Sequence, residues 1–328
     1  MIIKMNKLAV LTSGGDSPGM NAAIRAVVRN AAYSGLKCDG VYRGYQGLIE
    51  NEFIELGPRD VKNTINRGGT FLKSARSKSF MTKEGRQKAY DNLKSREIDA
   101  LVVIGGDGTF TGASVFSQEF DIPIIGIPGT IDNDINGTDY TIGYDTALNT
   151  VVEAIDKIRD TASSHDRLFL VEVMGRDAGD IALNSGIGAG AEEILIPEEN
   201  LGIDRLLESL EKSRKTGKTS SIVVVSEGDQ IGKNISAVAK SIESSLLDYE
   251  VKVTVLGHIQ RGGSPSCFDR VLASRMGVRA VEDLMKGKTN LMVGLINDKI
   301  AVTHLEQAVK GKSEINEELI RVSDIMTT

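Results

Sequence analysis

Short, uninterrupted apolar runs alternate along this chain with longer segments whose apolar residues recur every three or four positions. Residues 7–12, 100–104 and 124–127 are runs of the first kind, which suit strands buried on both faces of a parallel sheet. Residues 20–34 and 145–162 show the second spacing, which predicts amphipathic helices. The alternation of the two patterns indicates an α/β protein.

The rest of the chain continues this alternation. Further strands are expected over 37–42, 167–174, 194–197, 221–226 and 294–296, and a strand followed by a loop over 254–261. Further helices are expected over 57–65, 83–94, 112–120, 178–189, 201–215 and 269–286, with a partly helical segment at 305–325. A chain of 328 residues is too long for one ordinary hydrophobic core. We therefore expect two doubly wound, Rossmann-like domains, each with three αβα layers around a mostly parallel sheet.

A polar turn follows the buried run at 124–127. Pro128 ends the predicted strand, and Thr130, Asp132 and Asp134 stand just past its carboxyl end, where open α/β sheets bind their ligands. If this segment is extended, the two carboxylates point the same way, and one of them can accept a proton from a substrate hydroxyl. The alternative is a polar Asx turn that caps the next helix.

Two other buried strands end in glycine-rich turns that contain an aspartate. Residues 105–109 read Gly-Gly-Asp-Gly-Thr, and residues 13–16 read Ser-Gly-Gly-Asp. Glycine lets backbone N–H groups approach a polyphosphate closely. Asp107 would repel phosphate unless a cation lies between them, which favours a nucleotide bridged by Mg²⁺. Together the three turns predict a phosphate-binding site.

Other classes of protein fit the sequence less well. It contains neither a Walker A loop nor the G-x-G-x-x-G spacing, which disfavours a dinucleotide-dependent dehydrogenase. A formal net charge of −6 argues against nucleic-acid binding. No apolar run is as long as a membrane span, and the first seven residues lack the hydrophobic region of a signal peptide. Cys38 and Cys267 are far apart and are expected to be reduced thiols in a cytoplasmic protein.

Seven longer motifs occur in one fixed order. They are TSGGD at 12–16, PGMNAAIR at 18–25, NRGGT at 66–70, GGDGT at 105–109, PGTIDND at 128–134, VMGR at 173–176 and LGHIQRGGSP at 256–265. In these motifs the chain closely resembles the bacterial-type, ATP-dependent 6-phosphofructokinase family, from about residue 6 to about residue 300.

The resemblance implies an enzyme that phosphorylates the 1-hydroxyl of fructose 6-phosphate with Mg²⁺-ATP in glycolysis, giving fructose 1,6-bisphosphate and ADP. It implies two domains between which the chain crosses three times. Residues 1–141 and 254–304 would bind ATP, and residues 142–253 and 305–328 would bind fructose 6-phosphate and an effector. It also implies a cytoplasmic homotetramer with sites shared between subunits, and ADP or phosphoenolpyruvate as a possible effector.

The resemblance assigns roles to particular residues. Asp132 matches the base that takes the proton from the sugar, and Asp107 matches the carboxylate that faces Mg²⁺. The other positions matching catalytic residues are Thr130, Asp134, Arg176, Arg76 and Gly15. The positions matching ATP contacts are Gly15, Arg76, Ser77, Gly106, Asp107, Gly108 and Thr109.

Two further groups of residues follow from the same resemblance. The sugar-phosphate positions are Thr130, Ile131, Asp132, Arg167, Met174, Gly175, Arg176, Glu227, Lys252, His258 and Arg261. Of these, Arg167 and Lys252 match positions that reach a neighbouring subunit's site, and Lys252 replaces the usual arginine. The effector positions are Arg25, Arg29, Arg159, Gly190, Glu192 and Lys218, but Thr216 and Thr219 replace two usual lysines. Arg214 and Lys215 are close enough in sequence to compensate.

Two alternatives stay open within this interpretation. One is the pyrophosphate-dependent relative, in which the positions of Gly108 and Gly129 typically carry Asp and Lys. The two glycines favour ATP, because a carboxylate at position 108 would crowd and repel the nucleotide. The other alternative is a non-catalytic, nucleotide-sensing protein that binds a sugar phosphate. The intact set of Asp107, Thr130, Asp132 and Arg176 argues against it, because a binding protein does not need the base.

Overall fold

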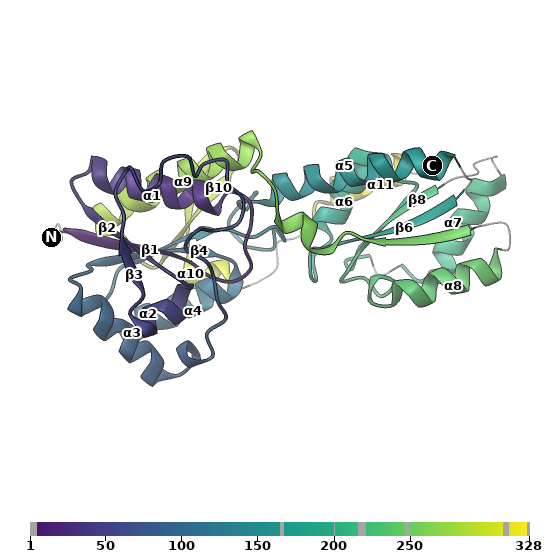
Figure 1. Ribbon diagram of the computed structural model, residues 1–328. Helices are drawn as coiled ribbons and strands as arrows, with labels where there is room; N and C mark the ends of the chain where they lie inside the picture. The colour runs from purple at the N-terminus through teal and green to yellow at the C-terminus, as the bar shows by residue number, and fades with distance from the viewer. Residues whose placement is uncertain are drawn as a thin grey trace. The chain divides into compact units, whose positions relative to one another are not determined.

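The computed structural model describes residues 5–164, 167–199, 201–215, 221–246, 250–310 and 315–326 (Figure 1). It divides the chain into two compact units. The first unit is Met1–Thr146 with Arg261–Ser313, and the second is Ala147–Gln260 with Glu314–Thr328. The chain therefore passes from one unit to the other three times.

A seven-stranded sheet forms the centre of the first unit, in the order β11-β10-β5-β4-β1-β2-β3. Its strands are β1 (Lys7–Thr12), β2 (Lys37–Val41), β3 (Phe53–Glu55), β4 (Ala100–Gly105), β5 (Ile124–Pro128), β10 (Leu291–Ile296) and β11 (Lys299–His304). The edge strands β3 and β11 pair antiparallel, and the other neighbours pair in parallel. The strands predicted from the three apolar runs are confirmed.

Helices cover both faces of this sheet and bury an aliphatic core on each. On one face lie α1 (Met20–Tyr33) and α9 (Cys267–Met285), and on the other lie α2 (Gly44–Glu50), α3 (Lys83–Ser95), α4 (Asp107–Glu119) and α10 (Leu305–Ala308), with a short 3₁₀ turn at Ser79–Met81 (Figure 1). Ile24 of α1 and Met276 of α9 are fully buried against the first face. Phe110 of α4 is fully buried against the second. The first unit thus has the expected three layers.

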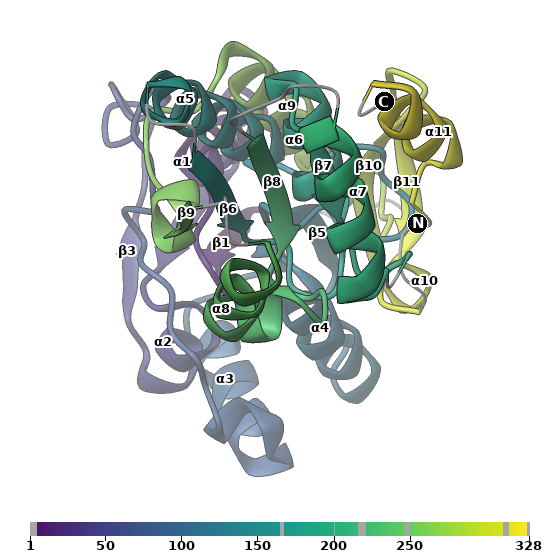
Figure 2. The same cartoon turned by 90° about the vertical axis from the view of Figure 1, so that its right-hand side faces the viewer.

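The second unit has a parallel four-stranded sheet in the order β7-β8-β6-β9 (Figure 2). Its strands are β6 (Arg167–Val173), β7 (Glu193–Leu195), β8 (Ser221–Ser226) and β9 (Glu250–Val255). Helices α7 (Ile203–Lys215) and α8 (Ile235–Ser245) pack on one face, where Leu206, Leu210 and Ile242 are buried. Helices α5 (Tyr144–Ser163), α6 (Asp180–Ala189) and α11 (Glu317–Met326) lie on the other face. Short 3₁₀ turns occur at Gly232–Asn234 and Gly257–Arg261.

Several local expectations were wrong. Residues 57–65 form turns instead of a helix, and Asn63 adopts a left-handed φ of 57° that a helix cannot contain. The strand expected at 294–296 is longer and continues into β11, because Asn297 and Asp298 form a tight turn with positive φ. Helices α2 and α8 and strand β3 were not expected. Residues 305–328 were expected in the second domain, but the short α10 belongs to the first unit. Its Leu305 is buried in the same cluster as Phe110.

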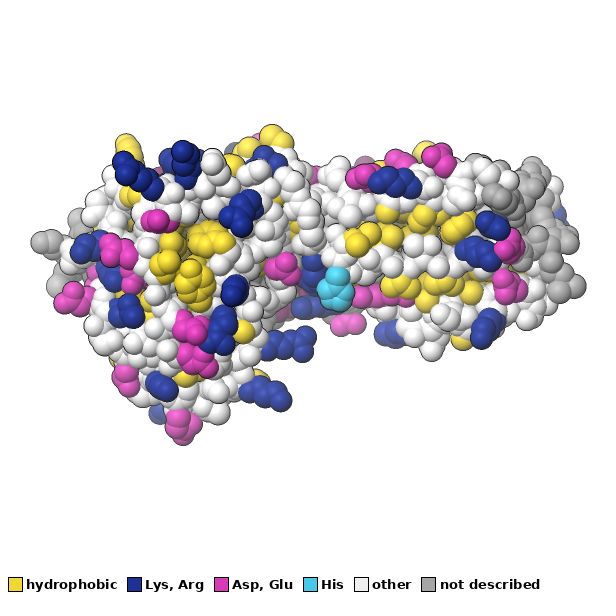
Figure 3. All heavy atoms as spheres, in the orientation of Figure 1, with side chains coloured by type: hydrophobic (Ala, Val, Ile, Leu, Met, Phe, Trp, Pro, Cys, Tyr) yellow, Lys and Arg dark blue, Asp and Glu magenta, His cyan; other side chains and the backbone are white. Residues whose placement is uncertain are grey.

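The surface mixes charges of both signs. On the face shown in Figure 3, positive, negative and hydrophobic side chains are interspersed over the coloured part of the molecule. This mixture agrees with a modest net charge of −6 and lacks, on that face, the continuous basic surface of a nucleic-acid-binding protein. Within the described residues, the length and hydropathy needed to cross a membrane are found in none of the helices.

Candidate active site

The three polar turns predicted from the sequence meet at the carboxyl ends of adjacent strands. The Ser13 N–H after β1 donates to the Ile104 carbonyl of β4 at 2.9 Å. The Gly129 N–H after β5 donates to the Gly105 carbonyl at 3.0 Å. The hydroxyl of Thr109 donates to the Ser13 carbonyl at 3.2 Å, which closes the set. The three turns are therefore adjacent in the structure, and their joint binding of phosphate stays a prediction.

The turn after β4 is also the first turn of a helix. Helix α4 begins at Asp107, five residues earlier than expected, so Asp107, Gly108 and Thr109 lie at its N-terminus. The helix dipole makes this end attractive to phosphate. The Tyr45 hydroxyl, itself buried, donates to the Thr109 carbonyl at 2.5 Å and holds the turn in place.

The donor set fits a magnesium ion only in combination with a substrate. Within the described residues, there is no group of three or more His, Cys, Asp or Glu side chains suited to a metal. Asp107 is half-buried at the helix N-terminus. Mg²⁺ is commonly held by one or two carboxylates together with phosphate oxygens and water. Asp107 fits that arrangement, whereas an all-protein magnesium site is not formed by the described residues.

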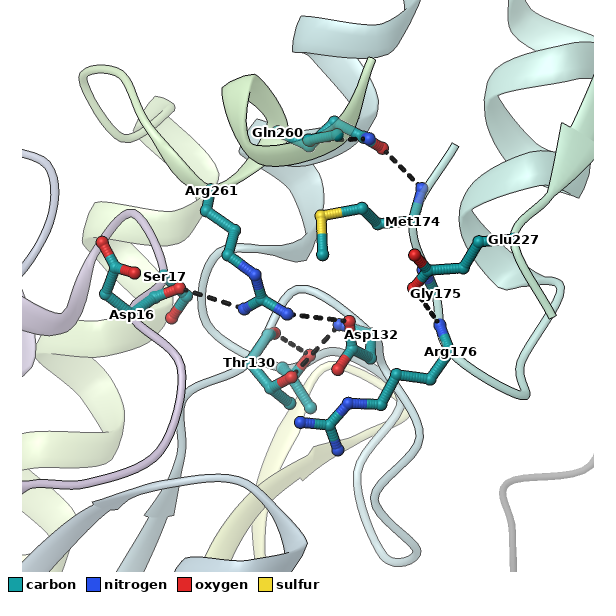
Figure 4. Close-up of polar contacts among 12 residues, drawn as sticks. Asp16, Ser17, Thr130, Asp132, Met174, Gly175, Arg176, Glu227, Gln260 and Arg261 are labelled. Carbon is teal, nitrogen blue, oxygen red and sulfur yellow. Dashed lines mark hydrogen bonds and ion pairs between the residues drawn. The ribbon is translucent and has the colours of Figure 1, made fainter. Parts of the chain in front are cut away.

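Asp132 lies in the turn after β5, which we call the β5 turn (residues 129–134). Its side chain has no exposed surface, and its carboxylate Oδ1 is 3.6 Å from Nη2 of Arg261 (Figure 4). The Asp132 N–H donates to the Thr130 hydroxyl at 3.2 Å. The turn thus places a buried carboxylate at ion-pair distance from a guanidinium, and a carboxylate is a group that can act as a general base.

The premise of an extended Asp-x-Asp segment was wrong. Asn133, between the two aspartates, adopts a left-handed φ of 55°. Its side-chain oxygen accepts from the Thr141 N–H at 2.9 Å, so the turn is closed by an amide. Asp132 is fully buried, whereas Asp134 is only half-buried. The structure therefore gives the two carboxylates different environments. Ile131, which lies between Thr130 and Asp132 in the sequence, is also buried.

Gly15 makes room for Arg261. A Cβ atom at Gly15 would lie 2.7 Å from Nη1 of Arg261, which is too close for any real contact. The same Nη1 donates to the Asp16 carbonyl at 3.3 Å. The sequence assigned Gly15 to ATP, whereas this contact gives it a second, steric reason: it lets Arg261 lie beside Asp132.

We predict that Gly15→Ala displaces Arg261. The methyl group must push the guanidinium away, because Arg261 is the flexible partner in the contact. The resemblance assigns Arg261 to the sugar phosphate, and losing one charge-assisted hydrogen bond to that ligand would cost about 1.5–3 kcal/mol. On that assignment we expect KM for the sugar phosphate to rise about tenfold or more. Steady-state kinetics measures this change. Gly202→Ala is the control, because nothing lies within 4 Å of its added Cβ. Equal kinetics for the two variants would contradict the prediction.

The other ATP positions lie in the loop before α3. Arg76 is exposed there. The hydroxyl of Ser77 donates to Oε1 of Gln46 at 2.7 Å and accepts from the Phe80 N–H at 3.2 Å. Ser77 thus shapes the loop that presents Arg76. Whether either residue contacts ATP stays a prediction.

In the second unit, a strained turn follows β6. Gly175 has φ 140° and Arg176 has φ 52°. Oε1 of Glu227 accepts from the N–H groups of Gly175 at 3.3 Å and Arg176 at 2.9 Å (Figure 4). Oε1 of Gln260 accepts from the Met174 N–H at 3.2 Å, and Gln260 is fully buried. The turn that presents the Arg176 side chain is therefore fixed from two sides.

Gln260 was not assigned a role from the sequence. Its position between His258 and Arg261 was the only hint in the sequence of a role at the site. The contact with Met174 joins residues 86 positions apart, so no local pattern predicts it. His258 itself is exposed. A pocket of about 580 Å³ lies beside Glu227, and its lining also includes Glu172 and residues 232–237. Burial and the neighbouring Glu227 raise the pKa of Glu172.

Arg167 and Lys252 lie at the other end of the same sheet. Nε of Arg167 is 2.7 Å from Glu250, and Nζ of Lys252 is 2.6 Å from the same carboxylate. The two cations, Arg167 first, lower the pKa of Glu250 to about 2. Strand β6 runs from Arg167 to Val173, so these ends are about 20 Å apart at about 3.3 Å per residue. One chain therefore does not bring Arg167 together with its own Arg176 turn.

The effector positions form two groups. In the second unit, Nη2 of Arg159 donates to the carbonyls of Ala189 at 2.8 Å and Gly190 at 2.6 Å, and Nη1 lies 3.4 Å from Glu192. In the first unit, Arg25 and Arg29 are one turn apart on α1, and burial together with Arg29 lowers the pKa of Arg25. Lys218, Thr216, Thr219 and the Arg214 side chain lie outside the described residues.

The chain is similar to proteins of known activity along nearly its whole length. It is 53% identical over 315 residues to ATP-dependent 6-phosphofructokinase 2 of Bacteroides thetaiotaomicron, which covers 96% of each chain. It is 54% identical over 322 residues to ATP-dependent 6-phosphofructokinase 1 of Thermus thermophilus, covering 98% of this chain and 99% of that one.

Solved structures and a family model agree with these relatives. A phosphofructokinase from Saccharomyces cerevisiae has a TM-score of 0.87 and 36% identity, covering 98% of this chain and 46% of the longer yeast chain. A pyrophosphate-dependent phosphofructokinase from Marinobacter aquaeolei, 24% identical, shares the fold with a TM-score of 0.85 over 96% of this chain and 86% of its own. The phosphofructokinase family model matches residues 7–284. The chain belongs to the phosphofructokinase family.

Proposed function

We propose that this chain transfers the γ-phosphoryl group of ATP to the 1-hydroxyl of fructose 6-phosphate, giving fructose 1,6-bisphosphate and ADP in glycolysis. The observation that carries the proposal is Asp132, a fully buried carboxylate beside Arg261 where the three polar turns meet. Relatives more than 50% identical over nearly the whole chain are ATP-dependent 6-phosphofructokinases, which supports the same donor and acceptor.

Asp132 is assigned the proton transfer. As the sugar hydroxyl attacks, its proton passes to the carboxylate. The hydrogen bond of the Asp132 N–H to Thr130 holds the backbone from which this carboxylate projects. Asp134, half-buried in the same turn, helps to orient this group. Arg261 lies near enough to Asp132 to orient it and to meet a substrate phosphate. In the second unit, we assign Met174, Gly175, Arg176, Glu227 and His258 to the sugar phosphate.

The nucleotide phosphates are assigned to the N-terminus of α4. The dipole of this helix and the space above Gly108 suit a polyphosphate. Arg76 and Ser77, in the loop before α3, are assigned to the same ligand. A magnesium ion, held by Asp107 together with the phosphates, would supply charge neutralisation when bound. The chain's own part is to position the phosphates and to present Asp107 at the helix end.

A coupled assay tests the proposed function directly. Fructose 6-phosphate is supplied with either ATP or pyrophosphate, and the formation of fructose 1,6-bisphosphate is followed. We expect turnover with ATP and little or none with pyrophosphate. Equal rates with both donors would point to the pyrophosphate-dependent class, and binding of sugar phosphate without turnover would point to a sensor.

We further propose that the sugar-phosphate site is completed by a neighbouring subunit of a homotetramer. The support is the separation of about 20 Å between Arg167 and the Arg176 turn along β6. Arg167 and Lys252 are therefore assigned to the site of another chain. The effector proposal, ADP or phosphoenolpyruvate, rests on Arg25, Arg29, Arg159, Gly190, Glu192 and Lys218. A reducing, cytoplasmic location fits the free thiols of Cys38 and Cys267.

A subunit-mixing experiment tests the shared site. Arg167→Ala chains and Arg176→Ala chains are each expected to lose most activity at low fructose 6-phosphate. In mixed oligomers, some sites combine an intact Arg176 with an intact Arg167 from the neighbour, so activity should return. Native mass spectrometry verifies the mixing. Verified hybrids without recovery, or a fully active monomer, would show that each chain builds its own site.

A further inference from the structure

Helix α9 carries a buried carboxylate that none of the roles above uses. Asp269 has no exposed surface, and it lies in the first turn of α9. Its Oδ1 accepts from the Gly143 N–H at 2.8 Å. Its Oδ2 accepts from the N–H of Thr146 at 2.9 Å and from the Thr146 hydroxyl at 2.5 Å. One carboxylate therefore receives three hydrogen bonds from a four-residue segment at the start of α5.

Burial of this carboxylate has a cost. Desolvation raises the pKa of Asp269 to about 6, against the hydrogen bonds from Thr146 and Gly143, which lower it, and nearby Asp145 adds to the rise. The hydrogen bonds thus do not fully compensate the ionised form for the loss of water. A neutral side chain at position 269 would avoid the cost of desolvation. The presence of an aspartate there is therefore better explained by the Gly143 and Thr146 groups that it holds than by stability alone.

The segment that Asp269 holds is attached to the β5 turn. The Ile142 N–H, next to Gly143, donates to the Pro128 carbonyl at 2.9 Å. The Thr141 hydroxyl donates to the Thr130 carbonyl at 2.7 Å. The Thr141 N–H donates to the side chain of Asn133, as described above. Residues 141 and 142 therefore brace the β5 turn on both sides of Asp132.

The same segment has little freedom to shift in another direction. Gly143 has φ 104°, and a Cβ atom there would lie 2.5 Å from Cβ of Ser17. The Ser17 hydroxyl donates to the Ile142 carbonyl at 2.8 Å. Ser266, the N-cap residue of α9, donates its N–H to the Thr146 hydroxyl oxygen at 2.9 Å, so the start of α9 holds Thr146 through a second contact. The position of the brace is thus set by α9 and by residue 17 together.

We propose that Asp269 is a positioning residue: by holding Gly143 and Thr146, it fixes the segment that keeps the β5 turn in its reactive geometry. The proposal rests on the proposed function in one respect, namely that the β5 turn carries the base. A shift of about 1 Å at a reacting group can lower a rate on the order of 100-fold. Loosening the brace is therefore expected to act on kcat more than on the binding of either substrate.

The first test is Asp269→Asn, which keeps the size of the side chain but places an NH₂ group against N–H donors. We expect kcat to fall on the order of 10–100-fold, with KM for ATP and fructose 6-phosphate changed about threefold or less. The matched control is Asp283→Asn, on the same helix. Asp283 is equally buried, but it pairs with Arg279 at 2.8 Å and Lys288 at 3.1 Å. We expect this control to lower Tm and leave kcat unchanged.

A conservative pair tests the route through Thr146. Thr146→Val removes the hydroxyl that donates a hydrogen bond to Asp269, and Thr146→Ser retains that hydroxyl. We expect Thr146→Val to lower kcat and Thr146→Ser to restore most of it. A double-mutant cycle then combines Asp269→Asn with Thr141→Val, which removes the hydroxyl bond to Thr130. If both act on one brace, their effects on kcat are not additive. Additive effects, or a kcat for Asp269→Asn equal to that of Asp283→Asn, would overturn the proposal.

A measurement without substrates separates this proposal from the proposed function. Hydrogen–deuterium exchange of peptides covering residues 128–146 reports on the Ile142 and Asp132 N–H groups. We expect faster exchange there in Asp269→Asn than in Asp283→Asn. Unchanged exchange would overturn the brace even in an active phosphofructokinase. If Asp269→Asn exchanges faster but the original chain lacks phosphofructokinase activity, the proposal that Asp269 holds this segment stands and the assigned reaction is rejected.

Discussion

Replacing Asp132 by asparagine is expected to lower kcat by about 10²–10⁴-fold or more. Asparagine has nearly the same shape but cannot accept the proton of the sugar hydroxyl. The corresponding loss of transition-state stabilisation is about 2.7–5.5 kcal/mol. Because Asp132 is fully buried and held by its own N–H bond to Thr130, the variant should keep the turn in place. Rapid-quench or steady-state kinetics at saturating ATP measures the change.

Binding distinguishes a lost base from a distorted site. Calorimetry should show fructose 6-phosphate binding to Asp132→Asn within a few-fold of the original chain, because the Met174–Arg176 turn is held separately by Glu227 and Gln260. Arg261 loses the charge of its neighbour, so a somewhat tighter phosphate contact is compatible with the assignment. Near-full turnover of the variant would remove Asp132 from the role of base.

The sequence supplied the positions of the polar turns because they depend on local pattern. Uninterrupted apolar runs such as 100–104 have few ways to be buried other than in a parallel sheet, and their ends then lie at one edge. The start of α4 was missed for a local reason as well. Asp107 and Gly108 add nothing to a helical apolar spacing, although an aspartate in the first turn of a helix is favoured by the dipole.

What the sequence could not supply are contacts between distant positions. Asp269 and Gly143 are 126 positions apart, and neither lies in a pattern that names the other. Arg167 and Lys252 were expected to serve one phosphate, but only the register of β6 with β9 shows that Glu250 lies between them. The length of β6 shows in addition that Arg167 lies a strand's length from the Arg176 turn. Family motifs gave the residue types, whereas the folded chain shows which groups hold them in place.

Replacing Gly108 by aspartate is expected to abolish most of the use of ATP without harming the fold. Gly108 is exposed in the first turn of α4, and nothing lies within 4 Å of an added Cβ atom. A carboxylate at a helix N-terminus stabilises the helix by about 0.3–1 kcal/mol, so Tm should stay constant or rise. Toward a bound nucleotide, the same carboxylate is a like charge. At about 4 Å and an effective dielectric constant of about 20, the repulsion is about 4 kcal/mol.

A repulsion of that size corresponds to a loss on the order of 10³-fold in kcat/KM for ATP, at about 1.36 kcal/mol per factor of ten. Gly108→Asn is the matched control, because it adds the same bulk without the charge. We expect its kcat/KM for ATP to fall by about tenfold or less, which separates crowding from repulsion. KM for fructose 6-phosphate should stay nearly constant in both variants. If the two variants lose ATP activity equally, the charge is irrelevant and position 108 does not face the nucleotide phosphates. A loss that grows as ionic strength is lowered would instead identify electrostatic repulsion as its cause, because salt screens partly exposed charges.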